Sequence, residues 1–288
     1  AASPVTRSFA IAAQLLPSPS PTRTYSLTIA IIGDGTVAAS PARGLLAAGT
    51  TVTLRAQPGA GQLFTGWVVN GVVRSYATDV QLVMSDHRAV VARFAPQPAF
   101  ADVPTTTAAH AAIGQLAARG IIRGYDPQTF GPDDPTLRAQ MAALIARAMG
   151  WDAEDHGNAF PDQGTVDADL WRNVGTLAFH DVARGYPDGT YDPTGEVLNA
   201  QVISFIARAM VAKGYWTQQP DDPALYPGVP LASGHRQDIA TFVHYAGALP
   251  DQSGGATFGT WDRPATRAWF ARALWSALLS QFTITLIP

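Results

Sequence analysis

Apolar side chains recur at helical spacing in six segments after Pro98, and the segments form three successive pairs. The apolar positions of each segment fall at i, i+3 and i+4, with i+7 added in the second segment of a pair, which places them on one helix face. They are Ile113, Leu116 and Ala117 with Met141, Leu144, Ile145 and Ala148; Val174, Leu177 and Ala178 with Val202, Phe205, Ile206 and Ala209; Ile239, Phe242 and Val243 with Phe270, Ala273, Leu274 and Ala277. The pattern predicts three units, each with a helix, a glycine-rich loop and a second helix.

Between residues 25 and 95 the period changes to that of β-strands. Short alternating or β-branched runs are bounded by turn residues, namely YSLTIAII, TVTLRAQP, FTGWVV, DVQLVM and AVVARF. Asn70 and Gly71, directly after the third run, predict a tight hairpin turn. Pro96 and Pro98 separate this segment from the helical one. The predicted fold class is therefore α+β, with a small N-terminal β domain followed by a mainly helical unit.

The helical part of the chain repeats itself. FADV…GIIRGYDPQTFGPDDPTLRAQMAALIARAM, from Phe100 to Met149, is nearly matched by FPDQ…VARGYPDGTYDPTGEVLNAQVISFIARAM, from Phe160 to Met210, and a less similar copy follows from Tyr226. We assign the copies to residues 99–151, 159–216 and 225–282. Such a repeat indicates one supersecondary unit that has been multiplied, with binding sites expected in the grooves between copies.

Both ends of the chain have features of docking segments. Residues 1–24 combine an apolar stretch with the linker PSPSPT, whose alternating prolines favour an extended conformation without a core of its own. Residues 283–288, within FTITLIP, form a strand-like tail. We expect the arm to dock on its own domain or on a neighbouring subunit, and either segment can add to a neighbour's β-sheet edge.

Composition and charge exclude several classes of function. The formal net charge is −3, Lys213 is the only lysine and the arginines are placed singly, so no basic stripe for nucleic acid exists. The chain has no cysteine for disulfides or thiolate metal sites, and no apolar run of the roughly 18 residues that a membrane span needs. The start AAS is what an exported chain shows after removal of a signal peptide.

Nothing in the sequence indicates catalysis. The six histidines are scattered, and no HExxH, GxSxG, Walker or GxGxxG pattern occurs. Paired carboxylates such as Asp133 with Asp134 lie beside prolines in loops, which is typical of solvated turns. We therefore predict a protein that is not an enzyme and that has no metal and no cofactor.

The helix-to-helix connections carry a resemblance to a known family. GYDPQTFGPDDPTLRAQ, GYPDGTYDPTGEVLNAQ and GGATFGTWDRPATRAW resemble the S-layer homology (SLH) domain, whose second helix opens with TRAE. The resemblance implies that three copies assemble into a pseudo-threefold prism, whose grooves bind secondary cell-wall polysaccharide, often through a pyruvylated sugar. Separately, GDGTVAASP, GTTVTLRAQPGAGQLFTGW and AVVARF resemble the bacterial repeat related to internalin B-repeats. That resemblance implies a small β-grasp-like module of exported surface proteins, with Trp67 in its core.

The TRAE position supplies the candidate polymer-binding residues. Arg138 and Arg267 occupy it in copies one and three, whereas copy two has Asn199. An arginine in the first turn of a helix adds bidentate hydrogen bonds to the anion site that unpaired backbone N–H groups form, so it suits a carboxylate such as a pyruvyl ketal. The alternative is that the arginines only bind neighbouring carbonyls or pair with Asp residues. Asn199 predicts that one groove has lost its strongest anion contact.

Other positions qualify this interpretation. Trp171 is the better candidate for stacking on a sugar, while Tyr125 and Tyr186 are either sugar platforms or residues that anchor the loops to the core. The family's Thr and Glu, which form a capping box, are reduced to one partner in each copy. Copy one has Leu137 and Gln140 at these positions, copy two has Leu198 and Gln201, and copy three keeps the Thr as Thr266 but has Trp269 in place of the Glu.

Three functions remain open from the sequence. In the first, the protein is an exported, extracellular, non-enzymatic structural protein of the cell envelope that is attached to wall polysaccharide. In the second, it is a subunit of a surface layer or extracellular filament, which forms a homo-polymer or binds other envelope proteins through its arm, its tail or its repeats. In the third, it is an accessory carbohydrate-binding module.

Overall fold

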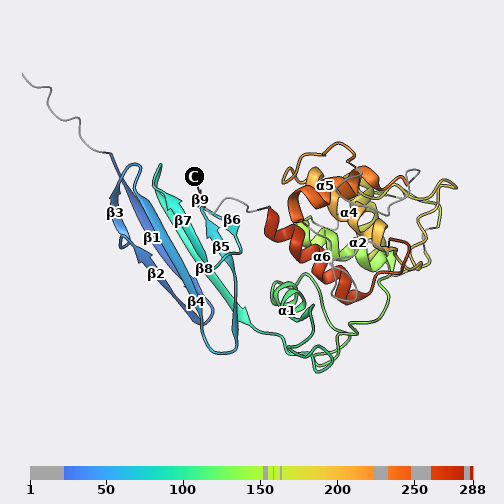
Figure 1. Ribbon diagram of the computed structural model, residues 1–288, viewed down its shortest axis with the longest axis horizontal. Coiled ribbons are helices and arrows are strands. Elements are labelled where there is room, and N and C mark those ends of the chain that lie inside the picture. The colour runs from blue at the N-terminus through green and yellow to red at the C-terminus, as the bar shows by residue number, and fades with distance from the viewer. Residues whose placement is uncertain are drawn as a thin grey trace, which may run out of the picture.

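The computed structural model describes residues 23–151, 155–157, 159–162, 164–222, 233–247, 261–281 and 286–287. Eight strands between Thr24 and Pro96 precede six helices, and a two-residue strand follows the last helix. Figure 1 shows the strands on one side of the molecule and the helices on the other. The α+β class is confirmed. Residues 1–22 of the predicted arm, and the start of the third copy at Tyr226, lie outside the described residues.

The N-terminal part is built from two β-sheets. One sheet has the order β3-β1-β8-β5-β6, in which β1 and β8 run parallel, and the other has the order β2-β4-β7-β9. No helix falls within residues 24–96. The β-grasp-like arrangement stays a prediction. The strands are β1 Thr24–Ile32, β2 Gly35–Ser40, β3 Gly44–Ala47, β4 Thr51–Pro58, β5 Gln62–Val69, β6 Val72–Ser75, β7 Asp79–Val83, β8 Arg88–Pro96 and β9 Leu286–Ile287.

The predicted alternation is visible in the burial of these strands. On β4, Val52, Leu54 and Ala56 are buried while the residues between them are exposed, as a strand with one face on a core requires. The Trp67 side chain is 0% exposed and its Nε1 donates to the Ala77 carbonyl at 3.0 Å. The predicted core role of Trp67 is confirmed. Asn70 and Gly71 have φ of 50° and 83°, the left-handed pair that the predicted tight turn needs.

The sequence reading missed β2, β3 and β6. All three lie at a sheet edge, and each has at most one buried side chain. An edge strand with few buried positions has no strong hydrophobic alternation, so no period could reveal it.

All six predicted helices are present. Their predicted apolar faces point into one shared core, which includes Ile113, Met141, Val174, Phe205 and Phe270. The helices are α1 His110–Ala118, α2 Arg138–Met149, α3 Ala168–Phe179, α4 Asn199–Ala212, α5 Arg236–Ala246 and α6 Arg267–Ser280.

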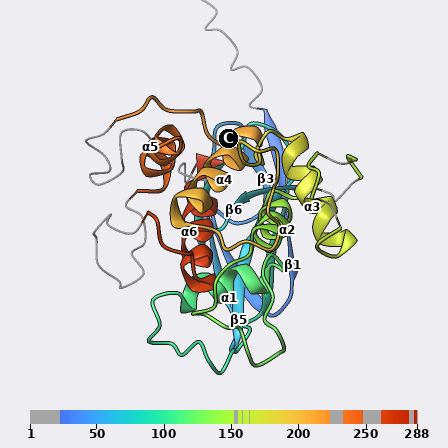
Figure 2. The ribbon, with the colours of Figure 1, turned by 90° about the vertical axis from the view of Figure 1, so that its right-hand side faces the viewer.

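The three helix pairs close into a ring. Within the described residues, the second helix of each copy packs on the first helix of the next, so that α2 contacts α3, α4 contacts α5 and α6 contacts α1. Figure 2, which views the molecule from the helical side, shows the helices grouped around this core. In the ring, the apolar faces of each pair are thus covered largely by the neighbouring pairs, as in repeat proteins.

The β part touches the helical part at one junction. Arg119, at the C-terminal end of α1, lies over the rings of Tyr76 and Trp275, with its guanidinium carbon 4.4 Å and 4.6 Å from the two ring centres. Its Nη2 also donates to the Phe64 carbonyl at 3.3 Å. One cation therefore contacts β5, the segment after β6, and α6 together.

The described end of the C-terminal tail is a strand, as predicted. Leu286 and Ile287 pair in parallel with Gln81 and Leu82 of β7. They extend the second sheet of their own chain, and whether the tail also pairs with a neighbouring subunit stays a prediction.

Candidate functional site

The segments that precede α2, α4 and α6 meet in a closed triangle of backbone hydrogen bonds. Thr136 N–H donates to the Ala265 carbonyl at 2.9 Å, Ala265 N–H to Val197 at 2.7 Å, and Val197 N–H to Thr136 at 3.0 Å. Each copy thus donates to one neighbour and accepts from the other. The candidate residues Arg138, Asn199 and Arg267 are the first helical residues after this triangle, so the ring places them in equivalent positions.

The N–H groups in the first turns of these helices are already paired. Carbonyls of the next copy accept from the first two N–H groups of each helix, and this corrects the expectation that unpaired N–H groups are available to an anion. The bonds run from Arg138 to Gly195 and Ala139 to Pro193, from Asn199 to Arg263 and Ala200 to Trp261, and from Arg267 to Asp134 and Ala268 to Pro132, at 2.9–3.2 Å.

The same bonds explain why leucine is tolerated at two helix starts. Leu137 and Leu198 cannot cap a helix with a side chain, and neither does. The carbonyls of the next copy take over that role. The predicted partial capping boxes are seen where Thr266 Oγ1 accepts from Trp269 N–H at 3.2 Å and Gln201 Oε1 accepts from Leu198 N–H at 3.1 Å.

Arg138 is enclosed by the second copy. The residue is 3% exposed, and its Nε donates to the Tyr191 carbonyl at 2.7 Å. The guanidinium carbon lies 4.6 Å from the ring centres of both Tyr186 and Tyr191. The bond to Tyr191 is the alternative contact with a neighbouring carbonyl, and contact of Arg138 with a wall polymer stays a prediction. Its positive charge is stabilised by the aromatic faces of Tyr186 and Tyr191.

Arg267 makes the equivalent contacts with the first copy but is more open. Its Nε donates to the Phe130 carbonyl at 3.0 Å and its Nη2 to the Arg123 carbonyl at 2.8 Å, with Tyr125 and Phe130 against the guanidinium. Burial lowers the pKa of Arg267, while Tyr125, Asp134 and Asp102 act in the opposite direction. The guanidinium stays charged at neutral pH.

The surroundings of Arg267 offer a surface rather than a pocket. The cavity beside it measures about 20 Å³, which is room for about one water molecule. Tyr125, whose ring lies against the guanidinium, is 60% exposed. A ligand at this place would therefore contact the outer edge of the arginine and the tyrosine face.

Two further predicted residues do not reach solvent. Trp171 is 5% exposed and meets the rings of Phe160 and Tyr191 edge-on, with centres 6.5 Å and 6.4 Å away. Its ring is thus packed within the core, and its stacking on a sugar stays a prediction. Asn199 is 1% exposed, so it supplies no contact at the surface. Tyr186 remains half-buried beside Arg138.

Two aspartates hold the loops that carry these aromatics. The Asp102 carboxylate accepts from the N–H groups of Phe130 and Gly131, and the Asp162 carboxylate accepts from those of Tyr191 and Asp192, at 2.7–3.1 Å. Burial raises the pKa of Asp102, but the backbone donors outweigh it, and the pKa lies below its ordinary value. Each aspartate therefore positions the loop of its own copy.

The site has no feature of a metal centre. Across the described ranges, no group of three or more His, Asp or Glu side chains could hold a metal ion. In the same part of the chain, none of the helices has the length and apolar character needed to cross a bilayer.

The sequence did not point to Arg119, because nothing in its own segment shows that Tyr76 and Trp275 come together around it.

Comparison with known families agrees with this architecture. Residues 99–142 match the model of the S-layer homology domain, and residues 25–98 match that of the divergent InlB B-repeat domain. Over these residues the chain is similar to one SLH domain and to one divergent InlB B-repeat domain. The second and third copies lie outside the matched range.

The chain is also similar to three bacterial surface proteins. A cell surface protein of Thermoanaerobacter kivui is 31% identical over 179 residues, or 56% of this chain and 23% of that protein. A surface layer protein of Brevibacillus choshinensis is 28% identical over 158 residues, or 51% of this chain and 13% of that protein. A middle cell wall protein of Brevibacillus brevis is 25% identical over 137 residues, or 46% of this chain and 12% of that protein. The chain thus spans less than a quarter of each relative.

Proposed function

We propose that this chain is an exported, non-enzymatic structural component of a bacterial cell envelope, and that its helical ring consists of three SLH repeats. The family match over residues 99–142 supports the first repeat. The second and third helix pairs are supported by their equivalent hydrogen bonds in the closed triangle of Thr136, Val197 and Ala265. The surface proteins to which the chain is similar support an extracellular location.

In this proposal the ring binds secondary cell-wall polysaccharide through Arg267 and Tyr125. The observation that carries it is that Arg267, unlike Arg138, is only half-buried and lies beside an exposed aromatic ring. A guanidinium in that position can bind a carboxylate, such as that of a pyruvylated sugar, by charge-assisted hydrogen bonds.

The test is co-sedimentation of the purified chain with wall sacculi. Arg267→Ala removes a charge-assisted contact of about 1.5–3 kcal/mol, so the affinity should fall at least tenfold. Arg184→Ala is the matched control, because Arg184 is an exposed arginine paired with Asp181 at 2.9 Å. Mild acid treatment, which cleaves pyruvyl ketals, should remove binding of the unchanged chain. Equal binding by Arg267→Ala and Arg184→Ala would refute the site.

A second candidate function is assembly into a surface layer or filament. The observation that favours it is β9, because a two-residue strand covers the edge of β7 that would otherwise be open. An open strand edge is a template for a strand from another copy. If copies exchange the tail, removal of residues 282–288 should abolish polymers in electron micrographs, and polymers that persist would exclude this route. Removal of residues 1–24 tests the arm in the same way.

A further inference from the structure

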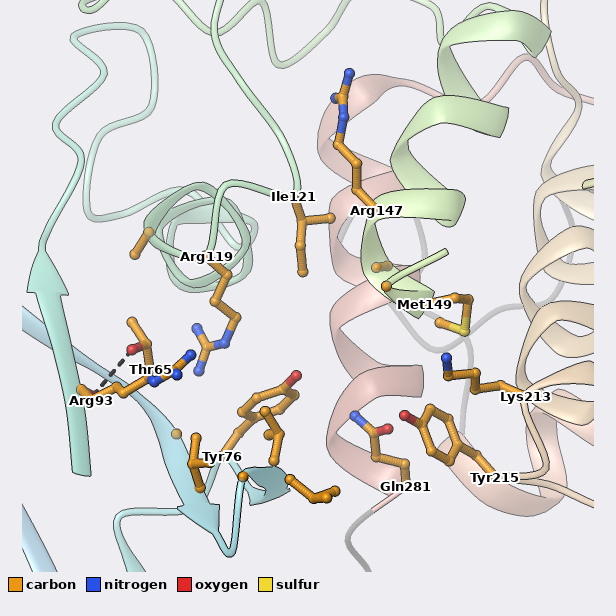
Figure 3. A pocket seen from close by; sticks show the side chains of 18 residues that line it. Thr65, Tyr76, Arg93, Arg119, Ile121, Arg147, Met149, Lys213, Tyr215 and Gln281 are labelled. Atoms are coloured by element: carbon orange, nitrogen blue, oxygen red, sulfur yellow. Dashed lines mark hydrogen bonds between the residues drawn. The ribbon is translucent and has the colours of Figure 1, made fainter. Parts of the chain in front are cut away.

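A cavity of about 700 Å³ lies at the junction of the β part and the helical ring. Its walls come from β5, β6 and β8 on one side and from the C-terminal ends of α1, α2, α4 and α6 on the other. Figure 3 shows Arg119 beside Tyr76, with Lys213 and Tyr215 directed toward them from the opposite wall. The volume falls in the range of about 300–1,000 Å³ that is usual for ligand sites.

The lining side chains that carry a charge at neutral pH are all basic. Arg93, Arg119, Arg147 and Lys213 contribute to its walls, and no carboxylate of the described residues does. None of these four takes part in a salt bridge within the described part of the chain. The chain as a whole has more acidic than basic residues, 22 against 19, so a cluster of one sign is not a consequence of composition.

Helix dipoles offset only part of this positive charge. Four helices end at the cavity, with C-caps at Arg119, Gly150, Lys213 and Gln281. Each C-terminus carries roughly half a negative charge, so the four ends offset roughly two of the four positive charges. Because Figure 3 shows Arg147 directed away from Arg93, Arg119 and Lys213, roughly one positive charge remains among those three for an anion to neutralise.

Arg119 is held in place before any ligand arrives. Its Nη1 donates to the Gln115 carbonyl at 2.7 Å, and its guanidinium rests on the rings of Tyr76 and Trp275. Burial lowers the pKa of Arg119 to about 10. Its Nε is buried and has no hydrogen-bond acceptor among the described residues. That atom is closed to solvent, so an oxyanion in the cavity would accept from the other N–H groups of Arg119.

The rest of the wall suits a hydroxylated ligand. Tyr215 and Gln281 contribute polar side chains, while Val72 and Val73 line the cavity as exposed apolar residues. Such a mixture of a few polar groups and apolar surface is typical of small-molecule sites. It can contact both the hydroxyl groups and the carbon faces of a sugar.

We infer that this cavity binds an acidic saccharide, whose phosphate or carboxylate lies between Arg119, Arg93 and Lys213. The site is separate from Arg267 and does not depend on the function proposed for that residue. Arginine binds both oxyanions bidentately, so the two acid groups are distinguished by experiment.

Calorimetric titration of the full chain tests the inference with trigalacturonate as the carboxylate, glucose 6-phosphate as the phosphate, and maltotriose and inorganic phosphate as controls. We expect at least one acidic sugar to bind, maltotriose not to bind, and inorganic phosphate to bind more weakly than the acidic sugar. Binding of neither acidic sugar, or equal binding of maltotriose or inorganic phosphate, would overturn the inference.

Two variants assign the binding to this cavity. Arg93→Gln combined with Lys213→Gln should weaken it at least tenfold. Arg93 is exposed and Lys213 is partly exposed. An unchanged circular dichroism spectrum would show that the variant is folded. Arg43→Gln is the matched control, because Arg43 is an exposed arginine in the turn between β2 and β3. Undiminished affinity in the double variant would exclude the site.

Lys213 offers a second readout, since it is the only lysine of the chain. A bound acidic sugar should slow the reaction of Lys213 with an amine reagent, followed by mass spectrometry of its peptide, and unchanged labelling at saturation would contradict the site. The double variant should still sediment with sacculi, and Arg267→Ala should still bind the acidic sugar. The two sites can therefore fail independently.

Discussion

Arg138 and Tyr191 are joined by two hydrogen bonds that run in opposite directions. The Nε of Arg138 donates to the main-chain carbonyl of Tyr191 at 2.7 Å, and the hydroxyl of Tyr191 donates to the main-chain carbonyl of Arg138 at 3.0 Å. Both residues are buried. The pair connects the first copy to the second across 53 positions of sequence, which makes it a good place to measure the stability of the ring.

Replacing Tyr191 by phenylalanine should destabilise the ring. The change removes the hydrogen bond from the Tyr191 hydroxyl to the Arg138 carbonyl, which keeps its helical bond within α2, and the loss costs about 0.5–1.5 kcal/mol. Urea denaturation measures the change in the free energy of unfolding. Tyr125→Phe is the control, since Tyr125 is largely exposed and should change stability by less than about 0.5 kcal/mol. Equal stability of Tyr191→Phe and the unchanged chain would contradict the role of this pair.

The stability of the protein should fall in alkali, in part because of the same tyrosine. Burial raises the pKa of Tyr191 well above its ordinary value of 10.0. Between these two pKa values the unfolded chain loses the proton while the folded chain keeps it, so stability is complete below about pH 10 and is lost as the pH rises toward the folded pKa.

One such tyrosine contributes a slope of up to about 1.4 kcal/mol per pH unit. Urea denaturation at about pH 8 and about pH 11 should therefore show a smaller loss for Tyr191→Phe than for the unchanged chain. Some loss should remain in the variant, because the pKa values of Tyr76 and Tyr215 are also raised. An identical loss in both proteins would argue against the buried, protonated state of Tyr191.

Asp102 should contribute more to the free energy of unfolding than an aspartate in a surface salt bridge does. Asp102→Ala leaves the N–H groups of Phe130 and Gly131 without their charged acceptor, and we expect a loss of about 1.5–3 kcal/mol in urea denaturation. Asp169→Ala breaks an exposed pair with Arg172 at 2.7 Å and should cost no more than about 1 kcal/mol. The reverse order of the two losses would show that the loop does not depend on Asp102.

Trp275 should couple the β part to the ring. Trp275→Ala removes one of the two rings under Arg119, and a cation–π contact of this kind is worth about 0.5–2 kcal/mol. Hydrogen exchange should become faster in the β5–β6 hairpin, while Phe179→Ala, a change at an exposed aromatic, should leave it unaltered. Unchanged exchange in Trp275→Ala would mean that the junction is held by other contacts.

Periodicity was enough to locate the helices, because burial of one face imposes a spacing of three to four residues on the sequence itself. Spacing alone predicts that Leu116 and Ile145 belong to a core, and both are buried. The edge strands β2, β3 and β6 could not be found in the same way. They bury too few side chains to leave a period.

The candidate site shows what spacing along the sequence does not predict. Arg138 and Arg267 occupy the same position of the repeat, yet one is 3% exposed and the other half-buried. The difference depends on the loop of the next copy that covers each arginine. The loop of copy two brings Tyr186 and Tyr191 to Arg138, and the loop of copy one brings Tyr125 and Phe130 to Arg267.

The α+β class, the three helix pairs and the equivalence of Arg138, Asn199 and Arg267 follow from the amino-acid pattern, because each depends on spacing within a short segment. The exposure of these residues, the capping of the helix starts and the cavity lined by four cations follow from the folded arrangement instead. Those properties arise from contacts between segments more than 50 residues apart, such as Arg138 with Tyr191 and Arg119 with Phe64. No local pattern records such contacts, since the free energy that selects them comes from packing of the whole chain.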